Sequence, residues 1–133
     1  VSVEDAPQMI LGYTIANDAT ARDAMTGGPW SRGKSFDSAC PLGPWITVDP
    51  ALDVTNLAIR SYLNGEIAQD SSTAHMIWNP FELVSYVSCQ MTLLPGDVIA
   101  TGAPAGAQVV HAGDRVEIEI EGIGRLANPV VRA

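Results

Sequence analysis

The sequence predicts a β-rich α+β domain, in which short strands of an antiparallel or mixed sheet are joined by tight turns and accompanied by short helices. Short runs of apolar and β-branched residues recur along the 133-residue chain, and Gly, Pro, Asn or Asp bounds each of them. One segment carries a strong helix-start signature. Hydrophobic residues make up 47% of the chain, which is enough to fill one core and too many for a disordered segment.

The first quarter of the chain predicts a helix, a strand and a loop. Ser2 and Asp5 have the spacing of a capping box, which favours a helix directly after Ser2. The apolar, aromatic and β-branched run that ends at Asn17 favours a buried strand, so Asp18 is expected at a strand end. A run rich in Gly and Pro follows. The expected elements are a helix at 3–8, a strand at 9–17, a helical turn at 19–25 and a loop at 26–33.

The middle of the chain predicts a β-hairpin and the main helix. Asn64-Gly65 is the favoured dipeptide of a type I′ hairpin turn, and strand-like residues flank it. Asn79, Pro80 and Glu82 supply an N-cap, a proline for the first helical position and the acid of a capping box. The expected elements are strands at 45–48, 57–63 and 66–69 and a helix at 80–88, with Phe81, Val84 and Val87 on one face.

The last third predicts three further strands, two of which follow tight turns of similar sequence. Glu117, Glu119 and Glu121 alternate along one of these strands, so they should share one face, and we expect that face to be solvated. The expected strands lie at 98–101, 115–121 and 126–131, which makes seven strands and two helices in all.

Charge and composition exclude several classes of function. Seven basic and fifteen acidic residues give a net charge of −8, and no segment concentrates Lys or Arg, so nucleic acid is not an expected partner. No apolar run approaches the ~20 residues of a membrane-spanning helix, so no membrane partner is expected. The two cysteines, Cys40 and Cys89, lack metal-ligand spacing and are too few for a disulfide framework, which favours a cytoplasmic location. Because the chain begins at Val1 without a leader, we expect a segment of a longer protein.

Two residues are candidates for chemistry on their patterns alone. A carboxylate at a strand end, such as Asp18, suits a hard divalent cation, but it suits the capping of the next turn at least as well. Lys34 is the only lysine among seven basic residues, which indicates a position that needs a compact ammonium group. A solvated loop lysine is the alternative interpretation.

Five motifs occur in a recognisable order along the chain. They are GYTIAND-x-x-ARD at 12–23, GKSFD at 33–37, CPLGPW at 40–45, NGE at 64–66 and LLPGDVIATGAPAG at 93–106. Together with EIEGIGRLAN at 119–128, they resemble the fumarylacetoacetate hydrolase family. The resemblance implies that residues 1–133 form a single domain, the C-terminal portion of that family's catalytic domain, with the fold of a β-strand roll.

The resemblance also implies an activity. Members of the family commonly form homodimers and use a divalent cation on small 2-oxo or 1,3-diketo acids, for hydrolytic C–C cleavage, decarboxylation, isomerisation or hydration. Mg²⁺ is the expected ion, with Mn²⁺ or Ca²⁺ as alternatives. A cation chelated by the oxygens of the keto acid acts as a Lewis acid towards a developing enolate.

The family's site residues can be carried over where the motifs match. Asp18 matches the aspartate that ligates the metal, and Ser38 lies where some members place a hydroxyl near the cation. Lys34 matches the active-site lysine. The expected substrate-binding residues are Arg22, in a segment that shapes the floor of the site, Met25, where many members have Gln, and Thr101 and Gly102, which precede Ala103 in a loop similar to TGTP.

One departure leaves a second interpretation open. The family's E-x-E pair of metal ligands lies well upstream of the aspartate, and here only seventeen residues precede Asp18. Glu117 and Glu119 cannot replace that pair, because they lie in the family's closing strand. The alternative is a truncated or degenerate, non-catalytic β-roll that acts as an interaction module. Missing strands would leave exposed edges, so we expect the isolated segment to self-associate.

Overall fold

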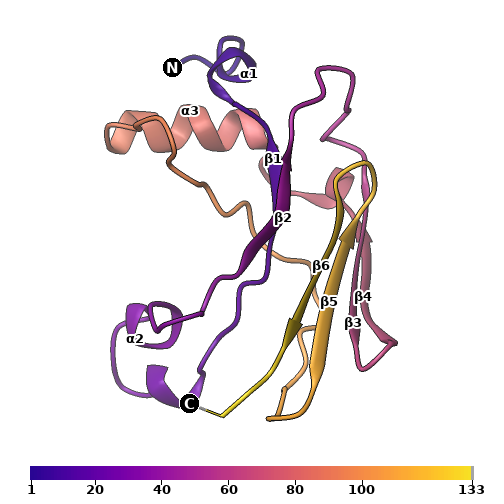
Figure 1. The fold of residues 1–133 in the computed structure, drawn as a ribbon. Helices are drawn as coiled ribbons and strands as arrows, with labels where there is room; N and C mark the ends of the chain where they lie inside the picture. The colour runs from indigo at the N-terminus through magenta and orange to yellow at the C-terminus, as the bar shows by residue number, and fades with distance from the viewer. Residues whose placement is uncertain (133) are drawn as a thin grey trace.

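The structure is a computed structural model that describes residues 1–132. Its six strands form two sheets in which every pairing is antiparallel. The first sheet pairs β1 (Tyr13–Ala16) with β2 (Leu42–Thr47). The second has the order β4-β3-β5-β6 and contains β3 (Ala58–Leu63), β4 (Glu66–Ser72), β5 (Arg115–Ile120) and β6 (Gly124–Pro129). β6 contacts both strands of the small sheet, as Figure 1 shows.

Five short helical elements accompany the sheets. They are α1 (Ala6–Met9), the 3-10 helix η1 (Asp23–Met25), α2 (Ser31–Lys34), the 3-10 helix η2 (Thr73–His75) and α3 (Pro80–Gln90). α1 packs against α3, and α2 packs against η1 (Figure 1). Within residues 1–132, no helix combines the length and the hydrophobicity that crossing a bilayer demands. These observations confirm the predicted fold class.

The two strongest local predictions are confirmed. Asn64 and Gly65 have φ values of 54° and 88°, both positive as a type I′ turn requires. At α3, the Asn79 side chain accepts hydrogen bonds from the backbone N–H groups of Phe81 and Glu82 at 2.9 and 3.0 Å. The Glu82 carboxylate accepts from the Asn79 backbone N–H at 2.7 Å, which completes the capping box.

Several other predicted elements differ from the structure. The predicted strand at 98–101 is wrong, since no strand within residues 1–132 pairs with it. The predicted loop at 26–33 contains most of α2. The strand predicted at 9–17 is shorter, because Met9 and Leu11 face solvent with exposures of 63% and 73%.

The predicted N-terminal helix begins later than expected. Ser2 closes a turn instead, since its hydroxyl accepts from the Asp5 backbone N–H at 3.1 Å and donates to the Asp5 carboxylate at 2.8 Å. The helix starts after that turn, at Ala6.

The core lies between the two sheets. Its buried members are Ile15, Val54, Leu57, Ile123 and Leu126, and Ile15 is completely buried. The core is small for the chain, since large side chains such as Trp30, Trp78 and Ile77 are exposed. Most of the rigidity near the start of the chain therefore comes from the strand pairing that surrounds Ile15.

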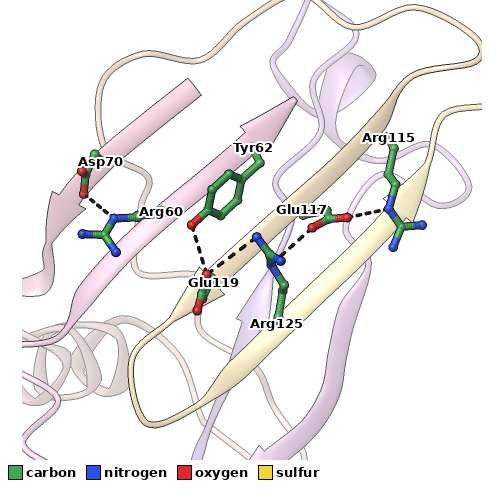
Figure 2. Close-up of polar contacts among 7 residues, drawn as sticks. All are labelled: Arg60, Tyr62, Asp70, Arg115, Glu117, Glu119 and Arg125. Atoms are coloured by element: carbon green, nitrogen blue, oxygen red, sulfur yellow. Dashed lines mark hydrogen bonds and ion pairs between the residues drawn. The ribbon is translucent and has the colours of Figure 1, made fainter. Parts of the chain in front are cut away.

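The charged face of the four-stranded sheet is less exposed at Glu117 than the alternation of Glu117, Glu119 and Glu121 predicts. The Glu117 side chain is only 17% exposed, because Arg115 and Arg125 cover it with ion pairs of 2.6 and 3.2 Å (Figure 2). The hydrogen bond from Arg115 holds the pKa of Glu117 below its ordinary value. Figure 2 also shows Arg125 beside Tyr62, with the guanidinium 4.5 Å from the ring centre. Cross-strand pairs therefore occupy this face.

Candidate functional site

The structure brings Asp18 and Lys34 together. The Lys34 Nζ donates to Asp18 Oδ2 at 2.6 Å, and the two side chains are 31% and 49% exposed. Within residues 1–132, Asp18 Oδ1 accepts no hydrogen bond. The pair therefore presents a free carboxylate oxygen and, because an ammonium group has three N–H donors, two further donors.

Backbone pairing explains why two residues from different loops meet. The β1–β2 pairing ends at Ala16 opposite Leu42, but hydrogen bonds continue beyond it. The amides of Asn17, Ala19 and Ala21 donate to the carbonyls of Pro41, Ala39 and Gly33, each at 3.0 Å. The last of these bonds joins the segment after Asp18 to the residue before Lys34.

Gly33 allows α2 to lie close to η1. It is buried, and a Cβ atom built on it would lie 2.6 Å from the Ala21 carbonyl oxygen and 2.7 Å from Met25 Sδ. Both distances are shorter than real Cβ contacts. Because Gly33 has no side chain, α2 can pack closely against η1. This packing determines the position of the Lys34 backbone and places Met25 against α2.

The other predicted site residues make no hydrogen bond to this pair within residues 1–132. Arg22 is exposed and directly precedes η1. Ser38 is exposed with a φ of 63°. Thr101 and Gly102 are exposed in the segment without regular structure between α3 and β5. Across residues 1–132, no hydrogen bond joins Ser38, Thr101 or Gly102 to Asp18 or Lys34.

The donor set fits a cation only in part. Asp18 offers a hard oxygen of the kind that Mg²⁺, Mn²⁺ or Ca²⁺ prefers. In the described part of the chain, however, no group of three or more His, Cys, Asp or Glu side chains could hold a metal ion. Asp18 therefore fits the role of one ligand among several.

A concave region lies elsewhere on the surface. An open hollow of about 590 Å³ is lined by Trp45 and by residues 119–125, and neither Asp18 nor Lys34 contributes to it. Its charged groups are already engaged. Glu119 and Arg125 take part in the cross-strand pairs of Figure 2, and Glu121 accepts a hydrogen bond from the Ala58 backbone N–H at 3.1 Å.

One polar connection was missed at the sequence level. Gln69 on β4 hydrogen-bonds Ser61 on β3 and the carbonyl of Pro104, at 2.7 and 2.6 Å. A regular two-residue hairpin would pair Ser61 with Ala68, and the register shift between Ser61 and Tyr62 pairs it with Gln69 instead. No local pattern therefore predicted this contact or its third partner, 35 residues beyond Gln69.

Comparisons with known proteins identify relatives of the chain. The family model described as "Fumarylacetoacetate (FAA) hydrolase C-terminal" matches residues 1–131. A 4-hydroxyphenylacetate degradation bifunctional isomerase/decarboxylase of Salmonella dublin is 45% identical, over 98% of this chain and 31% of its own length. The mitochondrial oxaloacetate tautomerase fahd2 of Xenopus laevis is 42% identical, over 98% of this chain and 44% of its own.

Solved structures share the fold. The 5-carboxymethyl-2-hydroxymuconate delta-isomerase of Mycobacterium smegmatis has a TM-score of 0.96 and 48% identity, over 100% of this chain and 53% of its own. The fumarylpyruvate hydrolase of Pseudomonas aeruginosa, solved in complex with Mn²⁺ and pyruvate, has a TM-score of 0.93 and 35% identity, over 100% of this chain and 59% of its own. The chain thus spans about half the length of most relatives that it matches.

Proposed function

Because the chain belongs to the fumarylacetoacetate hydrolase family, whose model covers residues 1–131, we propose that it forms the C-terminal portion of the catalytic domain of a metal-dependent hydrolase, decarboxylase or isomerase. The substrate is a 2-oxo or 1,3-diketo acid, and the reaction is acylpyruvate-type cleavage of a C–C bond through an enolate, or a related step. The names of the relatives, which include isomerases, decarboxylases, hydrolases and tautomerases, support this reaction class. The observation that carries the proposal is the Asp18–Lys34 pair.

Asp18 is a proposed metal ligand. Its Oδ2 holds the Lys34 ammonium, so Oδ1 is the oxygen that it offers to a cation. The Ser38 hydroxyl is the second proposed ligand in this chain, and the rest of the longer protein supplies the others. Mg²⁺ is the proposed ion, with Mn²⁺ or Ca²⁺ as alternatives, and the Mn²⁺ complex of the Pseudomonas relative supports a divalent cation. When bound, the cation supplies Lewis acidity towards the oxygens of the keto acid.

Lys34 is the proposed catalytic residue. The ion pair with Asp18 fixes the direction of the ammonium group, while the side chain stays 31% exposed and open to a small molecule. Its two remaining N–H donors can stabilise the negative charge that develops on an enolate oxygen. An enolate carries more charge on that oxygen than the starting ketone does, so the interaction favours the transition state over the bound substrate.

The proposed substrate-binding residues lie on two segments of the chain. Arg22 and Met25 lie on the segment that Gly33 allows to pack against α2. Thr101 and Gly102 begin the TGAPAG run, where a hydroxyl and a backbone N–H can hold the carboxylate or keto oxygens of the substrate. The proposal also includes a homodimer in the cytoplasm.

Two variants of the full-length protein test this assignment. Asp18→Asn should weaken Mn²⁺ binding by about tenfold or more in titration calorimetry. Losing a residue that only hydrogen-bonds a metal ligand already lowers metal affinity by about tenfold or more, and Asp18 is proposed as a ligand itself. Lys34→Met should lower kcat more than it raises KM, in assays of oxaloacetate decarboxylation and acylpyruvate hydrolysis. Asp70→Asn is the matched control, since it removes an exposed ion pair, with Arg60, on the other sheet. Unchanged Mn²⁺ affinity and turnover in both variants would reject the proposal.

A second candidate function is a non-catalytic interaction module. It is favoured by the single carboxylate ligand, which alone binds Mg²⁺ poorly because the ion gives up its water reluctantly. The same titration decides between the two functions: a full-length protein that binds neither Mg²⁺ nor Mn²⁺ supports the module.

A further inference from the structure

The Gln69 side chain joins the four-stranded sheet to the segment that carries Thr101 and Gly102. The hydroxyl of Ser61, which is 7% exposed, donates to Gln69 Oε1 at 2.7 Å. The Gln69 Nε2 in turn donates to the carbonyl oxygen of Pro104 at 2.6 Å. The Gln69 amide thus binds the sheet through its oxygen and the loop through its nitrogen.

The chemistry of the partners determines the direction of this amide. A proline carbonyl can only accept a hydrogen bond, so the NH₂ end of Gln69 must face Pro104. The oxygen end then faces Ser61, whose hydroxyl can rotate to donate. Ser61 is also directly opposite Gln69 in the β3–β4 pairing. The Pro104 carbonyl therefore determines which way the amide points, and the Ser61 hydroxyl donates to the oxygen that remains.

A close backbone approach accompanies this bond two residues further along. Gly106 has a φ of 105°, and a Cβ atom built on it would lie 2.8 Å from the carbonyl oxygen of Ala68. β4 is the edge strand of its sheet, so a chain segment can lie along its outer side. The run from Pro104 to Gly106 therefore lies against the edge of β4.

The segment has little else to hold it. Within residues 1–132, the bond from Gln69 is the one hydrogen bond that joins residues 98–110 to the rest of the chain. Figure 1 shows this segment as part of the orange coil between α3 and β5. Most of its side chains are exposed, so packing does not replace the missing bonds. The position of Thr101 relative to the sheet thus depends strongly on one amide.

We propose that Gln69 is a positioning residue, which places the Thr101–Gly102 loop for the keto acid. This inference rests on the proposed function, in which that loop holds the substrate. Gln69 acts through Pro104 and does not itself touch the substrate. Its loss should therefore affect the binding of substrate more than the chemical step, which belongs to Lys34.

Gln69→Glu in the full-length protein tests the inference. The carboxylate still accepts from Ser61, but it replaces the donor to Pro104 with an oxygen that repels the carbonyl. With oxaloacetate as the probe, KM should rise about three- to tenfold, the worth of one hydrogen bond, while kcat stays within about twofold. Cleavage within residues 98–110 by a nonspecific protease should also become faster, since the segment is held less firmly. Gln69→Ala should act alike, and Asp70→Asn, the adjacent residue on the opposite face, should change neither quantity.

The possible results separate this inference from the proposed function. An active wild type, a slow Lys34→Met variant and a normal KM in Gln69→Glu would overturn the role of Gln69 alone. Equal losses in kcat and thermal stability, with unchanged protease cleavage within residues 98–110, would indicate a merely structural role and also overturn it. A full-length wild type without turnover of any keto acid would reject the proposed function, and the role of Gln69 with it.

Discussion

Gly33→Ala should displace Lys34 and lower activity, although it adds only one methyl group, because Gly33 is buried against η1. Gly33 does not use the left-handed region, so alanine can adopt its backbone angles without strain. The obstacle is space. The new Cβ would lie 2.6 Å from the Ala21 carbonyl oxygen, where 3.0 Å is the limit for real Cβ atoms. The flexible Met25 side chain can turn away, but the Ala21 backbone cannot.

The size of the effect follows from this geometry. The two segments must separate by at least 0.4 Å to bring that contact from 2.6 to 3.0 Å. Overpacking costs about 1–3 kcal/mol, and the lower entropy of an unfolded alanine offsets about 0.4–1 kcal/mol, so we expect a net loss of about 1–2 kcal/mol. A misplacement of about 1 Å costs up to about a hundredfold in rate, so kcat should fall by about tenfold.

The assay compares two glycines of the same segment in the full-length protein. At Gly28, a Cβ would meet only the flexible Arg32 side chain, at 3.3 Å, and the backbone angles are again ordinary. Gly28→Ala should therefore keep its stability in urea unfolding and its kcat for keto acids, while Gly33→Ala loses both. If the two variants have the same kcat, then the position of α2 does not control Lys34, and the reasoning from Gly33 is wrong.

Two further predictions concern stability, and each is measured by urea unfolding. Asn79→Ala should lower the free energy of unfolding by about 1 kcal/mol, because two N–H groups of α3 lose their acceptor; an unchanged value would show that the capping box does not stabilise the helix. Hydrogen bonds from Asn64 and from the His111 backbone hold the pKa of Asp114 below its ordinary value. The ionised Asp114 carboxylate therefore stabilises the folded protein above the pKa of about 3.9 that it has in the unfolded chain. This stabilisation is lost as pH falls through the lower pKa of Asp114 in the folded protein. Asp114→Asn should therefore be less stable than wild type at neutral pH, and a difference that does not shrink as pH falls below about 3.9 would contradict this cause.

The elements that the sequence predicted well are those whose determinants lie within a few residues. The type I′ turn needs two residues that tolerate positive φ, and Asn64-Gly65 provides them without help from the rest of the chain. The start of α3 likewise needs only Asn79, Pro80 and Glu82. The ends of elements were less accurate, because β4 and α3 continue two or three residues beyond the local signals.

The prediction at 98–101 failed because a strand requires a partner. Its sequence has the β-branched and apolar residues of a strand, and a tight turn precedes it. Strand propensity reflects a fit to a half-buried sheet surface, however, and not a backbone preference alone. Val98 is 60% exposed, so the surface that would stabilise it as a strand is not provided by residues 1–132.

The membership of the candidate site is a prediction from the motifs, and its geometry could not be predicted. Asp18 and Lys34 were recognised from the motifs that contain them, and the family assignment is confirmed by the match over residues 1–131. Their contact depends on backbone bonds such as that from Ala21 to Gly33, which no local pattern reveals. The roles proposed for Asp18 and Lys34, and for the other site residues, remain predictions.

The choice of lysine at position 34 supports a chemical role for the pair over a structural one. Exposed ion pairs contribute only about 0–1 kcal/mol, so stability alone gives little reason to keep one. Where the described chain forms other ion pairs, the cation is always an arginine: Arg60, Arg115 or Arg125. Arginine would also bind a carboxylate with two parallel bonds, engaging both oxygens of Asp18. Lysine engages one, and so leaves the other oxygen and two ammonium protons for a cation and a substrate.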